Sequence, residues 1–330
     1  MSDAQAKQAI DQHTVSRCYL KRFASAQLQF FSFNKIYCKS SPSGTKGATV
    51  HEFFYDLHPA TLEDPNADIQ WVENTFKMLE NRYEKVLATA VCEADAGAIS
   101  FETGSSLAQL IAIQWMRTAG RRADILEAEQ KAMQAMIDTW YAENAPGIPP
   151  GKFKRGVGYE PGLHANLMFD EAAVFGIAEK FWNLCWIVGR NTTNQPFYTS
   201  DDPVVRDRIP PENDGPNVPP WVGIEYSFPL SSKFTLVMMD RFMFSKFANT
   251  NGENVERRTF DMGEVEVERY NALQVAKSTQ YVFCEENTFA LADRLCREEP
   301  RICDPVRCRE LVDATTLVFT ERGYSISLSE

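Results

Sequence analysis

The strongest constraint on the fold is a long helical pattern at residues 105–141, which carries two polar residues among apolar ones. At about 100° per residue, its core-facing positions form one broad stripe. These positions are Leu107, Leu110, Ile111, Trp115, Thr118, Ile125, Met133, Met136 and Trp140. A stripe of this width predicts a helix that packs against a core, because a coiled-coil seam would be narrower.

Gln114 falls inside this stripe and Arg117 lies at its edge, so we expect both side chains to be buried. Leaving a buried polar group unpaired costs on the order of 1–3 kcal/mol, and more when the group is charged. Both residues therefore need partners from elsewhere in the chain. Two interpretations follow: a structural polar bridge that fixes the helix register, or a functional site.

The hydrophobic period changes near residue 182, from helical to alternating. Helices are expected at about 15–24, 69–93, 105–141 and 163–181, and again at 264–278; strands are expected at 28–37, 183–189, 196–199, 225–230, 234–239 and 280–284. This order predicts an α+β fold in which a helical N-terminal half packs on a mixed or antiparallel sheet from the C-terminal half. We expect a single compact domain over 1–330, with a helical subregion at about 1–181 and a sheet-containing subregion at about 182–330.

The composition and the net charge limit the kinds of partner that the protein is expected to bind. The 330 residues are 44% hydrophobic, enough for a large core, and the net charge of −11 disfavours a broad grip on nucleic acid phosphates. Residues 1–11 lack the apolar stretch of a signal peptide, and no later segment has about 18 charge-free apolar residues. We therefore expect a cytoplasmic protein without a membrane partner.

The eight cysteines are expected to be reduced thiols in that compartment. Only Cys296, Cys303 and Cys308 cluster in the sequence, with Cys284 upstream. Their spacing is not that of paired zinc ligands and no histidine lies nearby, so no metal site is expected from them. No sequence motif names a cofactor or an oligomeric state.

Three positions in the helical half carry candidate chemistry. His13 lies just outside a short helix that Thr14 is expected to cap, which would leave the imidazole free to act in proton transfer. Glu73 and Glu80 share one flank of the helix at 69–93. They are weak candidates for metal ligands, and the alternative is a solvated helix edge.

Ser200 and Asp201 end a predicted strand just before a Pro-rich loop at residues 206–221. The end of a strand fixes the positions of a hydroxyl and a carboxylate, although the same residues are also typical of an ordinary turn. The basic, Gly-rich stretch at 152–162 is long enough to be a flap.

Several short motifs occur together in one order. They are His13-Thr14-Val15, Tyr19-Leu20-Lys21-Arg22-Phe23-Ala24, Glu73 with Glu80, Gln114-Trp115-Met116-Arg117-Thr118, Phe197 to Val204, and Phe228-Pro229-Leu230-Ser231. This order resembles the domain-of-unknown-function family 4238, an uncharacterised and mostly bacterial family, over residues 12–284. Asp202 stands where that family typically has asparagine. The family has no established activity, so the resemblance implies the architecture and the choice of residues.

Two functional hypotheses follow. In the first, the chain is a hydrolase or nuclease-like enzyme acting on a small-molecule or nucleotide-like substrate that contains phosphate, in bacterial defence or conflict. His13, Arg117 and Asp201 would be its catalytic groups, and Gln114 and Ser200 would bind the substrate. In the second, the same residues form a non-catalytic ligand-binding or regulatory module. Stronger catalytic signatures, such as a phosphate-binding loop or a nucleophile elbow, are absent from the sequence.

Both hypotheses rest on one structural prediction. We expect His13, Gln114, Arg117, Ser200 and Asp201 to converge where the helical and sheet halves meet, because buried polar groups must find partners.

Overall fold

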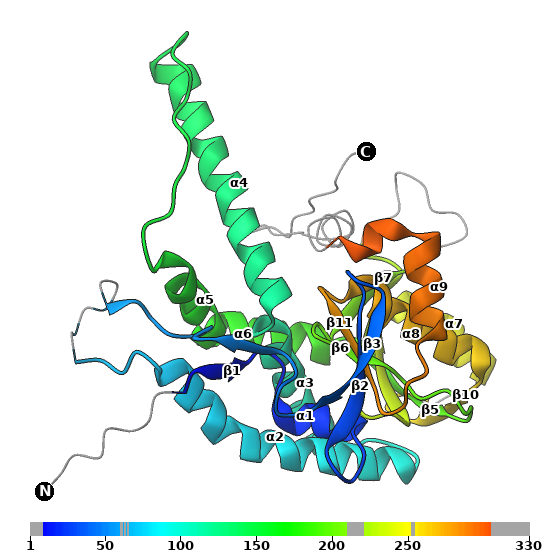
Figure 1. Cartoon of the computed structure of the whole chain (residues 1–330). Helices are drawn as coiled ribbons and strands as arrows, with labels where there is room; N and C mark the ends of the chain where they lie inside the picture. Colours follow the sequence, from blue (N-terminus) through cyan, green and yellow to red (C-terminus); the bar gives the residue numbers. More distant parts are fainter. Residues whose placement is uncertain are drawn as a thin grey trace, which may run out of the picture.

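A computed structural model describes residues 9–59, 62, 64, 66–209, 221–251 and 255–304 (Figure 1). The helices are α1 (Arg17–Leu20), α2 (Trp71–Asp95), α3 (Phe101–Met116), α4 (Ala119–Asn144), α5 (Tyr159–Phe169), α6 (Glu171–Trp182), α7 (Arg241–Asn251), α8 (Glu264–Lys277) and α9 (Ala290–Glu298), with short 3₁₀ helices η1 (Lys21–Phe23) and η3 (Pro300–Cys303). The strands are β1 (Asp11–His13), β2 (Gln29–Asn34), β3 (Lys39–Gly44), β4 (Val50–Glu52), β5 (Cys185–Asn191), β6 (Thr199–Ser200), β7 (Val205–Arg208), β8 (Ile224–Pro229), β9 (Phe234–Met239), β10 (Thr259–Met262) and β11 (Tyr281–Cys284). The expected α+β class is confirmed.

The largest sheet has the strand order β10-β5-β9-β8-β7 and is mixed, since only β10 runs parallel to its neighbour β5. Its two faces enter different cores. Trp186 and Val188 of β5 pack with residues of α2, α3 and α6, whereas Cys185 and Ile187 pack with residues of α8. Cover on both faces explains why β5 begins with a continuous apolar run instead of an alternating one.

The predicted division into a helical half and a sheet half is wrong in one respect. β2 and β3, from the N-terminal part of the chain, form an antiparallel sheet of order β3-β2-β11-β6 with two C-terminal strands. β1 and β4 form a further two-stranded sheet. The alternating pattern at residues 28–37 did predict a strand, but strand period alone does not identify the partner.

The expected helix at 105–141 is in fact two helices, α3 and α4. Thr118 takes an extended conformation (ψ 154°) and its hydroxyl accepts a hydrogen bond from the Arg121 N–H, which caps α4. α4 then extends away from the body of the molecule and the chain returns through α5 (Figure 1). Met136 and Trp140, assigned to a core stripe from the sequence, are therefore 66% and 56% exposed.

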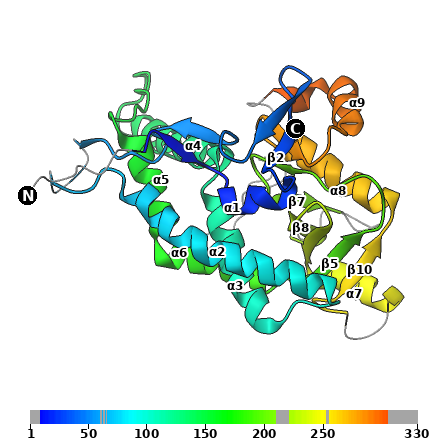
Figure 2. The same ribbon diagram turned by 60° about the horizontal axis from the view of Figure 1, so that its bottom comes forward.

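α2 and α3 lie side by side beneath α1, as the second view shows (Figure 2). Of the Pro-rich segment expected to form a loop at 206–221, residues 206–208 belong to β7, and residues 210–220 lie outside the described residues. None of the described helices is both long enough and apolar enough to cross a membrane.

Candidate functional site

The candidate site is built around the segment from His13 to Ser16, which joins β1 to α1. His13 is the last residue of β1 and pairs with Val50 of β4. Thr14 does not cap the helix as predicted, because its hydroxyl donates to the carbonyl of Thr49 (3.2 Å) and α1 starts only at Arg17. His13 is thus held in a strand, with its backbone fixed by a partner strand.

Gln114 of α3 anchors this segment through both ends of its amide. Its Oε1 accepts from the N–H of Ser16 (3.1 Å), and its Nε2 donates to the carbonyl of Thr14 (3.3 Å). The side chain is 3% exposed, as the helical pattern predicted. Its contacts are those of a structural bridge between α3 and the start of α1.

Arg117, just beyond the end of α3, is 1% exposed and approaches the same segment. Its Nη2 donates to the carbonyl of His13 (2.5 Å) and its Nε to the hydroxyl of Tyr55 (3.5 Å), while its guanidinium carbon lies 4.0 Å from the centre of the Phe76 ring. The remaining nitrogen, Nη1, is buried and has no hydrogen-bond partner. The guanidinium therefore keeps unused donor capacity inside the protein.

The His13 imidazole is close enough to this guanidinium to be influenced by its charge, and it also interacts with the backbone of Thr45 and Lys46. Its Nε2 is also buried and without a hydrogen-bond partner. Burial lowers the pKa of His13, and the positive charge of Arg117 lowers it further, against the opposing effect of Glu80. His13 is consequently neutral at pH 7 and keeps a ring nitrogen free for proton transfer.

His164 contrasts with His13 because both of its ring nitrogens are engaged. Nδ1 accepts from Nε of Arg122 (2.9 Å), so Nε2 carries the proton and donates to the carbonyl of Met116 (2.8 Å). Burial lowers its pKa to about 3. His164 is thus a structural histidine.

Acidic and hydroxyl groups of α2 complete the site. Glu80 accepts from the hydroxyl of Ser16 (3.1 Å), and the buried hydroxyl of Tyr83 has no hydrogen-bond partner. Glu73 forms an ion pair with Lys77 (3.7 Å). Within the described part of the chain, the two glutamates do not belong to a group of three potential metal ligands, so their weak candidacy as metal ligands gains no support.

Ser200 and Asp201 make a separate set of contacts on the sheet side. The Asp201 carboxylate accepts three backbone hydrogen bonds, from Thr279 (2.9 Å), Gln280 (2.7 Å) and Tyr281 (2.9 Å). The Ser200 hydroxyl donates to Oε1 of Gln274 (2.7 Å). The structure therefore brings His13, Gln114 and Arg117 together and ties Ser200 and Asp201 to the elements around β11.

The segment predicted as a flap lies along α4. Arg155 forms an ion pair with Glu129 (2.9 Å), and the Gln134 side chain bonds the backbone of Gly151 and Phe153. These contacts hold the segment against α4, the projecting arm that extends away from the body of the molecule. Tyr55 and Tyr83, by contrast, contact or face the site but are not among the residues predicted from the sequence, because no motif marks either tyrosine.

A model of the family described as "Protein of unknown function (DUF4238)" matches residues 11–288. The chain belongs to DUF4238. Searches of curated proteins and of solved structures found no significant match. The DUF4238 region begins at β1, includes His13, Arg117 and Asp201, and ends just before α9.

Asp202, where the DUF4238 pattern leads us to expect asparagine, links the two sets of contacts. It accepts from the hydroxyl of Thr118 (3.2 Å), next to Arg117. The site is tight, since a Cβ added at Gly120 would lie 2.8 Å from Oδ2 of Asp202. Burial raises the pKa of Asp202 to about 8, against the opposing charge of Arg121.

This raised pKa predicts a specific pH dependence of stability. The unperturbed carboxyl has a pKa of 3.8, so the folded state holds an extra proton between pH 3.8 and about 8, and stability falls as the pH rises through this window. Asp202→Asn should match the wild type near pH 4 and be more stable at pH 8. Urea unfolding at both pH values tests this, with Asp261→Asn, at an exposed site, as the control. If the free energy of unfolding fell by the same amount from pH 4 to pH 8 in Asp202→Asn and in the wild type, the prediction would be contradicted.

Proposed function

We propose that the protein is a hydrolase that acts on a phosphate-containing substrate, with Arg117 binding the phosphoryl group and His13 acting as general base. The observation that carries this proposal is the pair of unpartnered buried nitrogens, Nη1 of Arg117 and Nε2 of His13. The two residues are in direct contact through the His13 carbonyl. Buried nitrogens without partners are uncommon in native proteins and call for an explanation, which a bound ligand would supply.

Arg117 has the chemistry of an anion clamp. Its two engaged N–H groups bind neutral acceptors, and in the described structure no carboxylate lies within ion-pair distance of it. A buried charge without a counterion costs several kcal/mol, which an anionic ligand would offset. A guanidinium also matches a phosphate geometrically, because its planar donors form two parallel hydrogen bonds.

His13 has the chemistry of a base. A neutral imidazole with a lowered pKa accepts a proton from water at neutral pH, and Glu80 would stabilise the imidazolium that forms. The water oxygen would attack phosphorus as its proton passes to His13, and the leaving oxygen would take a proton from solvent. The net charge of −11 favours nucleotides and other small phosphate esters over long nucleic acids as substrates. A place in bacterial defence or conflict belongs to the same proposal.

The test separates binding from turnover. We expect His13→Gln to abolish hydrolysis of p-nitrophenyl phosphate or bis-p-nitrophenyl phosphate while still binding inorganic phosphate, because Arg117 is intact. Folding should be kept, because Nε2 makes no hydrogen bond and the glutamine amide can still donate to the backbone at Thr45 and Lys46 that the ring contacts. The wild-type rate should be flat at neutral pH and fall only below the ordinary pKa range of histidine, because the His13 pKa is lowered.

His51→Gln is the matched control, since His51 lies exposed on the neighbouring strand β4. Full activity in His13→Gln would overturn the catalytic role.

One observation favours the alternative of a binding module. Asp201, expected as the third catalytic group, has a carboxylate already engaged by three backbone N–H groups. Wild-type protein that binds phosphate through Arg117 but turns over neither a phosphate monoester nor a diester would support this second function.

A further inference from the structure

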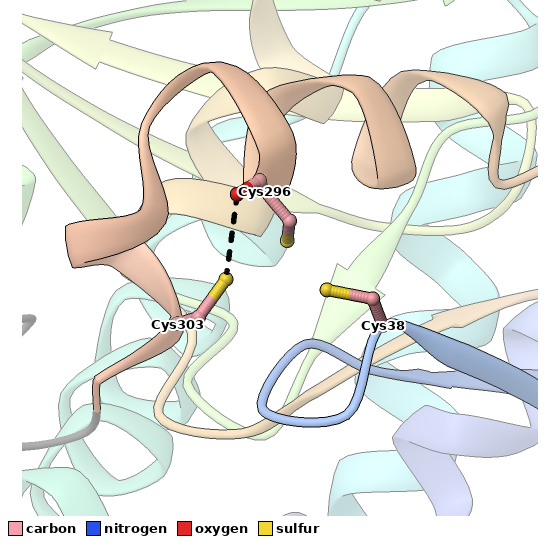
Figure 3. Close-up of side chains that lie close together, drawn as sticks. All are labelled: Cys38, Cys296 and Cys303. Carbon is pink, nitrogen blue, oxygen red and sulfur yellow. Dashed lines mark hydrogen bonds between the residues drawn. The ribbon is translucent and has the colours of Figure 1, made fainter.

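Three cysteines far apart in the sequence meet beside the four-stranded sheet (Figure 3). Cys38 lies in the turn between β2 and β3, Cys296 lies near the end of α9, and Cys303 ends η3. Their sulfur atoms all lie within 4.8 Å of one another, and no other such group of potential metal ligands occurs among the described residues. None of the three is in a disulfide.

The turn that carries Cys38 is an unusual place for a cysteine. Cys38 has a φ of +49°, in the left-handed region that favours glycine or asparagine. A side chain at this position costs roughly 1 kcal/mol. The Asn34 side chain stabilises the turn by accepting hydrogen bonds from the backbone of Ile36 and Tyr37. Cys38 therefore occupies a backbone position that glycine or asparagine adopts more readily.

The three thiols are also fixed in relation to one another. Lys35, in the same turn, donates to the carbonyls of Val275 and Ser278 at the end of α8. Phe33 of β2 packs against Phe289, next to the start of α9. One apolar cluster joins these elements and contains Phe33, Phe289, Ala292, Cys296 and Ile302. The thiols therefore meet through a packed core.

The spacing of the sulfur atoms suits a thiophilic metal ion. Zn–S bonds of about 2.3 Å in a tetrahedral site place the sulfurs roughly 3.8 Å apart, so only a small contraction is needed. Soft thiolate ligands select d¹⁰ ions such as Zn²⁺ and Cu⁺ over Mg²⁺ and Ca²⁺. Cys296 is buried whereas Cys38 is exposed, which gives an ion access from solvent.

We propose that Cys38, Cys296 and Cys303 bind one Zn²⁺ ion as thiolates, with a fourth position open to solvent. Each sulfur would bind the ion as its proton leaves to solvent, and no electron is transferred. The ion would clip the β2–β3 hairpin to α9 and η3, which lie beyond residue 288 where the family match ends. This site is independent of the one proposed at His13 and Arg117.

The affinity of the site for Zn²⁺ should depend on pH, because protons and the ion compete for the same sulfur atoms. Only the thiolate form binds the ion, so the thiols of the metal-free protein must lose their protons when it binds. Zn²⁺ must displace these protons, and its affinity should therefore rise with pH.

The test is metal titration of the full chain, treated with a chelator and a reductant. We expect one equivalent of Cd²⁺ to give sulfur-to-metal charge-transfer absorption, and we expect Zn²⁺, added alone, to raise Tm. Cys38→Ser should lower the Zn²⁺ affinity at least ~100-fold, since even outer-shell changes cost ~10–100-fold. Cys92→Ser, at an exposed cysteine on α2, should change nothing. Metal-free circular dichroism of Cys38→Ser and wild type should agree, because Cys38 is exposed.

Three outcomes would overturn the proposal. The first is equal Zn²⁺ affinity in wild type and Cys38→Ser. The second is binding that is lost in Cys308→Ser but kept in Cys38→Ser, which would place the ion elsewhere. The third is a disulfide between two of the three cysteines in protein purified under reducing conditions.

Discussion

Asp201→Ala should lower the free energy of unfolding by about 3–5 kcal/mol, because each unpaired buried N–H costs on the order of 1–3 kcal/mol. The Asp201 carboxylate accepts from three consecutive backbone N–H groups, those of Thr279, Gln280 and Tyr281, where β11 begins. The alanine variant leaves all three without a partner. Asp201→Asn should lose about half as much, since its single carbonyl oxygen replaces only part of the carboxylate.

Urea unfolding measures this effect, and an unchanged denaturant slope would show that the two-state transition is kept. Asp261→Ala is the control, because that carboxylate forms only an exposed ion pair with Arg190 and should matter little. If Asp201→Ala were as stable as the wild type but lacked hydrolase activity, Asp201 would instead be a catalytic residue.

Arg117→Met should weaken the binding of inorganic phosphate at least ~100-fold, since the two charged hydrogen bonds it removes contribute about 1.5–3 kcal/mol each. The methionine side chain still packs against Phe76, and removal of a buried charge offsets the hydrogen bonds lost to His13 and Tyr55. The fold should therefore persist.

Isothermal titration with phosphate gives the affinities. Arg155→Met, which breaks the ion pair with Glu129 on the projecting arm, should bind phosphate as the wild type does. Arg117→Lys keeps the charge without the planar donors and should fall between the two. Equal phosphate affinity in wild type and Arg117→Met would end the anion-site proposal.

The elements with a strong hydrophobic period were predictable from the sequence. The strand expected at 234–239 is β9 (Phe234–Met239), and the helix expected at 264–278 is α8 (Glu264–Lys277). The break at Thr118 was not predicted, because its threonine also fits an apolar stripe. In the structure Thr118 caps α4 and its hydroxyl also donates to Asp202, 84 residues away; helical period carries no information on either contact.

The candidate site was predicted in part for a related reason. The helical pattern placed Gln114 and Arg117 in the interior, where they are. Their acceptors proved to be the backbone carbonyls of Thr14 and His13, whereas side chains of Ser200 and Asp201 had been expected. Every residue has a carbonyl, so a sequence does not indicate which one a buried donor will reach. For the same reason, the sequence did not predict that Cys38 lies near Cys296 and Cys303, because strand pairing brings these residues together.

The pairing of β2 with β11 delays completion of the fold during synthesis. The bonded residues Lys35 and Ser278 are 243 positions apart, which a ribosome working at about 5–20 residues per second needs roughly 10–50 seconds to cover. Until then the β2–β3 hairpin has an open edge with apolar Phe30 and Phe33, and open strand edges promote aggregation. The nascent hairpin is therefore a segment that we expect a chaperone to protect until β11 has been synthesised.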